Sequence, residues 1–409
     1  MPSRHLSHRS VLPAVLAATA LVLSGTPAHA ARAPRVIETL RVPDHATLRV
    51  TGHGYGHGHG LSQYGAEGAA RKGLSAQRIV RFYYPHTHAG TFHGRVRVLI
   101  SEDTDQNTTV VNRAGLKVRD LGTGRTWTLP RTGRAGKASR WRLASRHGKP
   151  ARLAYHTGHW HLWRRLSGDG EFRASGPISV VLPGGARAYR GTLQSRTSTR
   201  GGSKPHRITV NKVSMESYVR AVVPSEAFPS WHQAALRAQA IAARSYAAYG
   251  VDHPLSRLYQ ICDTTACQVY GGVAAEYPTT DRATAKTAGQ IRTYHGRAAF
   301  TQFSASNGGW TAAGGKPYLP AQRDPYDGWS GNPYHSWTTN LSARRIERAW
   351  PALGNLTSIA IDRRDGHGQW HGRIVTMTLH GSKGDVRITG DDFRARLGLR
   401  STWFDLATA

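Results

Sequence analysis

The sequence has 409 residues, with 55 lysines and arginines against 24 aspartates and glutamates, and a formal net charge of +31. A chain of this size buries a sizeable core and forms one large or two ordinary domains. So strong a positive charge favours a polyanion or an anionic surface as partner. Beyond the first thirty residues no apolar stretch approaches spanning length, which excludes a membrane span in the mature chain.

Residues 1–30 are predicted to be a secretory signal peptide. Arg4 and Arg9 give a positive start, residues 11–25 form an uncharged apolar run, and residues 28–30 (AHA) supply the small-residue cleavage pattern. We therefore expect a secreted mature chain, in the extracellular space or the cell wall. An exported protein rarely meets nucleic acid, so anionic wall polymers and peptidoglycan carboxylates are the expected polyanions.

Residues 45–92 open with a block rich in histidine and glycine, followed by two predicted helices. The first helix covers 62–72 and is stopped by Gly73. Ser75 caps the second helix, which ends before Pro85.

Residues 93–204 are predicted to form a β-rich domain. Short alternating segments such as 95–100 (RVRVLI) and 178–182 (ISVVL) are separated by clusters of Gly, Arg and Thr. Between these segments, residues 131–150 are so basic and glycine-rich that we expect an exposed loop.

The remaining part, 205–409, opens with a helical pattern. Ser214 caps a helix that Pro224 breaks. Ser230 and Gln233 form a capping box at the start of an alanine-rich helix that runs to residue 249. The last fifty residues alternate again, as strands do. The predicted class is α+β, with mixed helical and β lobes around a cleft and the β-rich domain inserted or adjacent.

The only two cysteines are Cys262 and Cys267, five positions apart. In an oxidising compartment such a pair is more often a disulfide than a metal site, so we predict a disulfide. Its short loop would fix local geometry more than it would restrict the unfolded chain. No metal or cofactor is expected.

Glu226 lies between the two predicted helices, in residues 222–231 (VVPSEAFPSW). The prolines fix the backbone, and Phe228 and Trp231 are expected to form an apolar wall. A carboxyl group short of water has its charged form disfavoured, so it stays protonated near neutral pH, as a general acid at a glycosidic oxygen must. The positive end of the helix expected to start at Ser230 opposes this effect, but more weakly. Taken alone, a glutamate before a helix is more often a charge partner of the helix than a catalyst.

Residues 225–247 (SEAFPSWHQAALRAQAIAARSYA) resemble the signature of the stage II sporulation protein D (SpoIID) family, an acidic residue followed by EALKAQAVAARTYA. Four further blocks resemble the other motifs of that family: 52–66 (GHGYGHGHGLSQYGA), 268–272 (QVYGG), 303–309 (FSASNGG) and 396–404 (RLGLRSTWF).

The resemblance implies a lytic transglycosylase, which cuts peptidoglycan glycan strands between N-acetylmuramic acid and N-acetylglucosamine without water. The family acts on strands stripped of stem peptides, and its catalytic acid corresponds here to Glu226. One carboxylate suffices because the C6 hydroxyl of the muramic acid is the nucleophile, which gives a 1,6-anhydro product. A hydrolase would need a second carboxylate, for which Asp263, Asp324 and Asp327 are the candidates. The alternative is a wall-binding or amidase-stimulating module without turnover.

The resemblance also makes ten residues candidates for binding the strand: His57, His59, Ser62, Gln63, Arg244, Tyr246, Gln268, Tyr270, Ser304 and Ser306. The pattern H-x₃-H-x-H at 53–59 can also bind Zn²⁺ or Cu²⁺. We favour a sugar cleft there, in which glycines let the backbone approach the ring. Arg244 lies roughly 20 Å along its helix from Ser230, so a structural role is the other interpretation.

The chain departs from the family in two ways. The His/Gly block opens this chain, whereas in the sporulation enzymes it lies near the end. If the chain is permuted, residues 50–85 should pack against the helices around 214–249, and the ends near 45 and 404 should lie on the same side of the catalytic lobe. In addition, Ala227-Phe228 stands where the family has Met-Pro.

Overall fold

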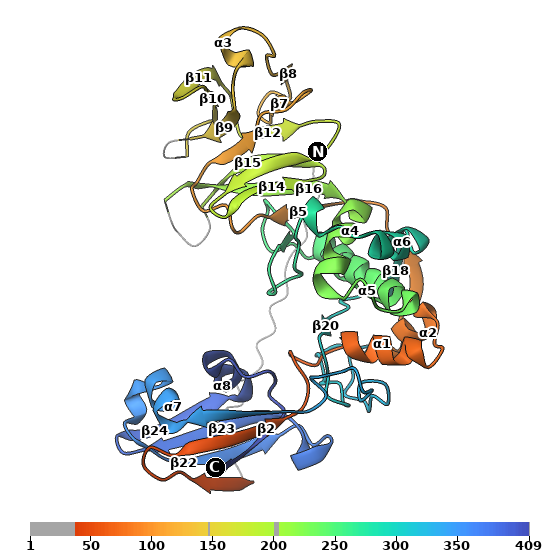
Figure 1. Cartoon of the computed structure of the whole chain (residues 1–409), viewed down its shortest axis with the longest axis vertical. Helices are drawn as coiled ribbons and strands as arrows, with labels where there is room; N and C mark the ends of the chain where they lie inside the picture. The colour runs from red at the N-terminus through yellow and green to blue at the C-terminus, as the bar shows by residue number, and fades with distance from the viewer. Residues whose placement is uncertain (1–36, 146–147, 200–203, 409) are drawn as a thin grey trace, which may run out of the picture. The chain divides into compact units, whose positions relative to one another are not determined.

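The computed structural model describes residues 37–145, 148–199 and 204–408 (Figure 1). The predicted signal peptide at 1–30 lies outside these residues. The described residues form α-helices and six β-sheets, which confirms the predicted α+β class. None of their helices is both long enough and apolar enough to cross a membrane.

Two large sheets form the β-rich part. Their strands bury alternate residues, as β9 does with Trp141 and Leu143, so apolar side chains collect on one face of each strand. The six-stranded sheet has the order β11 (Trp160–Arg165), β10 (Arg152–His156), β9 (Arg140–Ala144), β6 (Thr108–Val111), β13 (Ile178–Leu182), β14 (Gly185–Tyr189). The seven-stranded sheet has the order β17 (Ile261–Cys262), β5 (Arg95–Leu99), β16 (His206–Ser214), β15 (Thr192–Ser198), β12 (Gly170–Arg173), β7 (Lys117–Asp120), β8 (Thr126–Thr128).

Two predictions for this region are corrected by the structure. The β-rich part does not end at residue 204, because β16 lies between β5 and β15 in the seven-stranded sheet. Residues 131–150 are not one loop, since they contain the short helix α3 (Gly133–Gly136) and β9. Strand β9 forms despite its arginines because Trp141 and Leu143 reach the core while the arginines face outward.

Helices α4 (Met215–Glu226) and α5 (Gln233–Asp252) pack next to the seven-stranded sheet, and α6 (Pro278–Lys286) packs on these two helices. Ser214 caps α4 as predicted, but Pro224 does not break it. The helix continues for two residues past the proline, because the Ala227 N–H donates to the Val223 carbonyl and closes the last turn. Helix α5 begins two residues later than predicted, since its N-cap is His232 instead of Ser230.

The segment after the His/Gly block lies against α5. Helix α2 (Ala76–Tyr83) is capped by Ser75, as predicted. Helix α1 (Gln63–Arg71) is one residue shorter at each end than the predicted 62–72, because Ser62 is its N-cap. Both helices contact α5 (Figure 1), and their alanines form a close-packed core with the alanines of α5. Two small sheets complete this region: β19 (Arg297–Ala298), β18 (Gln290–Tyr294), β4 (His88–Thr91), and the parallel pair β20 (Phe303–Ser304), β3 (Leu61–Ser62).

The C-terminal residues form a separate apolar core with the first strands of the described chain. Two sheets and the helices α7 (Ala343–Ala349) and α8 (Gly390–Leu397) surround this core. The sheets are β1 (Glu38–Arg41), β22 (Leu356–Arg364), β23 (Ile374–Gly381), β24 (Gly384–Thr389), and β21 (Trp337–Ser342), β2 (Thr47–Gly52), β25 (Phe404–Thr408). Gly52 pairs with Phe404, so the two ends of the described chain meet in one sheet.

Candidate active site

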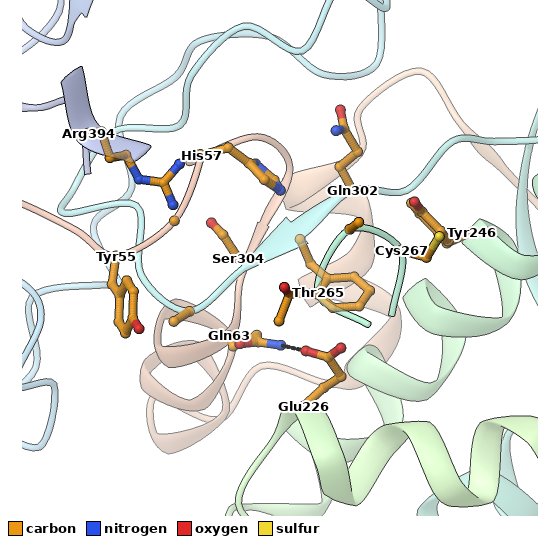
Figure 2. Close-up of a pocket in the computed structure, with 14 residues that line it drawn as sticks. Tyr55, His57, Gln63, Glu226, Tyr246, Thr265, Cys267, Gln302, Ser304 and Arg394 are labelled. Atoms are coloured by element: carbon orange, nitrogen blue, oxygen red, sulfur yellow. Dashed lines mark hydrogen bonds between the residues drawn. The ribbon is translucent and has the colours of Figure 1, made fainter. Parts of the chain in front are cut away.

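Glu226 opens into a pocket of about 340 Å³ that the two distant family blocks share (Figure 2). The His/Gly block and α1 contribute one part of the lining, α4 and α5 another, and the segments around 266 and 304 and Arg394 of α8 the rest. The fourteen lining residues are Tyr55, Gly56, His57, Gln63, Glu226, Tyr246, Thr265, Ala266, Cys267, Gln302, Phe303, Ser304, Ala305 and Arg394.

Glu226 is the last residue of α4 and is half-buried. Its Oε1 accepts a hydrogen bond from the backbone N–H of Val269 at 2.7 Å. Its Oε2 lies 3.4 Å from Nε2 of Gln63, which donates to it (Figure 2). These contacts fix the carboxyl group at the pocket wall from two sides.

Burial raises the pKa of Glu226, and the hydrogen bonds from Val269 and Gln63 oppose this rise without cancelling it. The carboxyl group also lies at the C-terminal end of α4, where the helix dipole disfavours a negative charge. The position expected from the sequence, before a helix N-terminus, would have the opposite effect. The helix dipole therefore adds to the effect of burial in keeping the proton on Glu226.

A disulfide holds the loop that orients Glu226. Cys262 and Cys267 are bonded, with their Cα atoms 5.5 Å apart. Thr265, Ala266 and Cys267 form a wall of the pocket, and the N–H of Val269 follows two residues later. The pair thus fixes the approach of a backbone donor to the carboxyl group.

Gln268 and Tyr270 do not line the pocket, contrary to the prediction, because both are buried in the protein. Gln268 accepts a hydrogen bond from the Tyr218 hydroxyl at 2.9 Å. The Tyr270 hydroxyl donates to the side-chain oxygen of Asn211 at 2.8 Å. The two motif residues flank Val269 and anchor its backbone on both sides.

Ser62 and Ser306 are likewise buried away from the pocket, and both donate to the buried carboxylate of Asp327, at 2.6 Å and 2.9 Å. Ser62 is also the N-cap of α1, since its Oγ accepts from the N–H of Gly65. Gln63 is the next residue, so this network sets the position from which it reaches Glu226.

His57 lines the pocket, whereas His59 packs behind it with the two ring centroids 4.7 Å apart. Nδ1 of His57 accepts from the His59 N–H at 2.9 Å, which places the ring proton on Nε2. Burial, with smaller effects from His59 and two arginines, lowers the pKa of His57 to about 3. His57 is therefore a neutral hydrogen-bonding group.

From the sequence, the glycines of the block were expected to let the backbone approach a sugar ring. In the structure they also let the backbone pack closely against other parts of the protein. A side chain on Gly56, which has φ +108°, would place its Cβ 2.6 Å from Cβ of Ser304. The backbone of the block can therefore approach β20 closely. Ser304 lines the pocket as predicted, and its Oγ accepts from the N–H of Gly58.

Tyr246 and Arg244 are two residues apart on α5 and have different environments. Tyr246 lines the pocket, and burial together with the charge of Glu226 raises its pKa, so its hydroxyl stays protonated. Arg244 has no exposed surface and forms a two-pronged ion pair with Glu216, at 2.9 and 2.8 Å. The prediction that Arg244 binds substrate is wrong, because no atom of it reaches the pocket.

Sequence reasoning missed several lining residues. Arg394 on α8 brings a guanidinium group to the pocket and lies two residues before the block taken as the closing motif, 396–404. Phe303 and Gln302 supply an apolar and a polar wall. The predicted apolar wall is not there: Phe228 is 55% exposed and packs on Trp231 and Tyr64 outside the pocket.

Among the described residues, Glu226 is the only carboxylate that lines this pocket. Asp263 accepts from the backbone N–H and the hydroxyl of Ser101. Asp324 accepts from Tyr83 and Asn307, and burial with the nearby Asp327 raises the pKa of Asp324 to about 6. None of the three predicted candidates for a second carboxylate is placed to act with Glu226.

The histidines of the block separate. The ring of His53 contacts the Gln369 side chain and the His335 carbonyl, while His57 and His59 lie together at the pocket side. In the part of the chain that the structure describes, no three His, Cys, Asp or Glu side chains are grouped to bind a metal ion.

The family model described as "Stage II sporulation protein" (SpoIID) matches residues 203–294, which include Glu226, Tyr246 and Val269. An uncharacterized protein of Brachyspira hyodysenteriae is 33% identical over 180 residues, 39% of this chain and 49% of its own length. The amidase enhancer of Bacillus subtilis is 34% identical over 135 residues, which are 32% of this chain and 17% of the relative's length. Stage II sporulation protein D of the same species is 31% identical over 225 residues, 48% and 61%. The chain thus spans less than two thirds of each of these relatives.

Proposed function

Because the chain belongs to the stage II sporulation protein D (SpoIID) family, we propose that it acts on the bacterial cell wall as a peptidoglycan lytic transglycosylase. The observation that carries this proposal is the single carboxyl group of the pocket. Glu226 is oriented by two donors, burial raises its pKa and so favours its protonated form, and no other carboxylate of the described residues lines the pocket. Such a site can supply a general acid and base but has no second carboxylate to activate water.

The proposed reaction uses Glu226 twice. Its carboxyl proton passes to the glycosidic oxygen as the bond from C1 of N-acetylmuramic acid to that oxygen breaks. The C6 hydroxyl of the same muramic acid then forms a bond to C1, and its proton returns to the Glu226 carboxylate. No water enters, so one product ends in 1,6-anhydromuramic acid and the other in a free hydroxyl on N-acetylglucosamine.

The other polar groups of the pocket fit a glycan strand without stem peptides. Each muramic acid then carries a free lactyl carboxylate, and Arg394 is the cation of the lining that can pair with it. His57, neutral at physiological pH, and Tyr246 offer hydrogen bonds to sugar hydroxyls. Phe303 offers an apolar face to a sugar ring.

This activity requires export, and the signal-peptide pattern of residues 1–30 agrees with it. The Cys262–Cys267 disulfide fits an oxidising compartment outside the cytoplasm. We therefore place the protein in the cell wall or the extracellular space, with glycan strands as its partner.

A second candidate is a module that binds the wall or stimulates an amidase without cleaving glycans. The similarity to an amidase enhancer favours it, as does the substitution of Ala227-Phe228 in the family motif. In the structure this substitution leaves Glu226 oriented toward the pocket. The enzyme is therefore the better supported of the two.

Digestion of purified, peptide-free glycan strands tests the proposal. Mass analysis should find ends lighter by one water than hydrolysed ends, which identifies the 1,6-anhydro product. Reducing ends on every fragment would show that water is the nucleophile. Intact strands, with normal binding, would leave the non-catalytic module.

A further inference from the structure

The β-rich segment 93–204 carries far more positive charge than its share of the chain. It holds 22 lysines and arginines against 6 aspartates and glutamates, a net charge of +16 in 112 residues. The candidate active site uses none of these residues. The proposed glycan cleavage therefore leaves this charge unexplained.

The acidic residues of the segment do little to neutralise its surface. Asp120 accepts backbone N–H groups of neighbouring turns, and Glu171 accepts from buried Thr192 and Gln194. Asp169 pairs with two arginines inside the domain. Most of the outward-facing arginines are left without an acidic partner among the described residues. The six acids are Glu102, Asp103, Asp105, Asp120, Asp169 and Glu171.

Two of the arginines without an acidic partner, Arg142 and Arg152, line a hollow on the outer face of β9, β10 and β11. On this face Ala154 of β10 stands between Arg142 of β9 and Leu162 of β11, and Ala144 pairs with Arg152. The two alanines make a low floor because their side chains end at Cβ. The longer side chains around them form a rim, and the hollow has a volume of about 360 Å³.

The rim combines charge with an aromatic platform. The Arg142 guanidinium lies over the ring of Trp160, 4.0 Å from its centroid, and Leu162 is 45% exposed beside it. Neither Arg142 nor Arg152 has an ion pair or a side-chain hydrogen bond with a described residue. The charge of Asp105 acts on Arg142, but the two side chains form no ion pair. Two cations with free donors thus border an apolar surface.

We propose that this hollow binds an anionic glycan polymer of the cell wall, at a site separate from the pocket of Glu226. The apolar face of a sugar ring would lie against Leu162 and the alanine floor, while Trp160 holds the Arg142 guanidinium at the rim. The phosphate or carboxylate of the sugar would bind between Arg142 and Arg152, since guanidinium groups match both anions in a two-pronged geometry. The site would hold the protein on the wall without taking part in cleavage.

The test measures binding of the full mature chain to purified wall teichoic acid, a phosphodiester polymer, and to a polyuronate, at low and moderate salt. Arg142→Gln/Arg152→Gln should weaken binding of at least one of them roughly 10- to 100-fold, since two charge-assisted contacts are lost. Trp160→Ala should weaken it about tenfold. Which polymer responds distinguishes phosphate from carboxylate recognition.

The matched control is Lys117→Gln/Arg131→Gln, which removes the same charge from exposed positions of the same domain. If both double variants lost the same amount of polymer affinity, the proposed site would be refuted, because the net charge of the domain would then explain the binding. Duplex DNA bound as tightly as the polymers, with the same dependence on Arg142 and Arg152, would also overturn recognition of a glycan. Glu226→Gln should bind normally, so failure of the proposed cleavage and failure of this site are separate results. Thermal melting of each variant confirms that the domain is folded.

Discussion

Replacing Glu226 by glutamine is the sharpest test of the proposed chemistry, because it changes the proton and little else. The glutamine oxygen can still accept the N–H of Val269, and the Gln63 amide can rotate to present its oxygen to the new amino group. The shape of the pocket is kept. The side chain can no longer give or take a proton.

The expected loss of activity follows from general acid–base catalysis. Removing a positioned acid typically slows a reaction ~10²–10⁴-fold, which corresponds to about 3–5 kcal/mol of activation barrier. Binding of the strand should change little, so the loss should appear in kcat and not in KM.

Stability gives an independent readout with a definite sign. Burial raises the pKa of Glu226 above its value in the unfolded chain. As the pH rises between the unfolded and the folded pKa, the unfolded chain loses its proton first, so the wild-type protein loses stability. Glutamine does not titrate. Glu226→Gln should therefore match the wild type at acid pH and be equally or more stable at neutral pH.

The assays are strand digestion with mass analysis and thermal melting at pH 4 and pH 7.5. Glu226→Asp is a useful control, because it keeps the titrating group but withdraws it from the Val269 N–H. A glutamine variant that cleaves strands within threefold of the wild-type rate would refute the role of Glu226. A variant that unfolds at neutral pH but not at acid pH would refute the assigned direction of the pKa shift.

Three further predictions concern the surroundings of this group. Gln63→Leu removes a donor to the Glu226 carboxylate, so the alkaline limb of the pH–rate profile should move to higher pH by less than about one unit; a downward shift would contradict the contact. Arg244→Met removes a buried cation from its ion pair with the partly exposed Glu216 and should lower the free energy of unfolding by less than about 3 kcal/mol, with KM unchanged in the folded fraction. A selective rise in KM would instead support the predicted contact of Arg244 with substrate. Replacing Cys262 and Cys267 by serine should lower the free energy of unfolding by at most about 2 kcal/mol. The rate of strand cleavage should fall by more than the loss of folded protein explains. In the wild type without reductant, neither cysteine should react with an alkylating reagent.

The sequence was most informative where local chemistry decides structure. The serine caps of α2 and α4 were predicted at the correct residues, because a cap depends on a few neighbours in the chain. The start of α5 was missed by two residues for a tertiary reason. The Glu67 carboxylate on α1 accepts the N–H of His232, which fixes the helix end at a residue that the local pattern does not favour.

The prediction of the site was also limited to what local sequence can show. The resemblance pointed to Glu226, Gln63 and Tyr246, which the structure brings to one pocket. It could not separate residues that face the pocket from those that support it, since both belong to the same motifs. Gln268 belongs to the second class: it is buried beside a backbone donor and never reaches the pocket. Arg394 could not be found, because its contact with the pocket exists only after α8 is packed.

The order of the family blocks is compatible with one cleft for a reason that the structure makes explicit. The His/Gly block is held by backbone hydrogen bonds, from His53 to the Trp403 carbonyl and from Gly56 to the Arg400 carbonyl. These partners belong to the closing motif at 396–404, whose continuation β25 pairs with β2 directly before the block. Because the block and the closing motif contact each other in space, a chain can supply the block before the catalytic helices or after them. What the fold requires is that Gln63 arrives beside Glu226, and the antiparallel pairing of the two ends of the described chain meets that requirement.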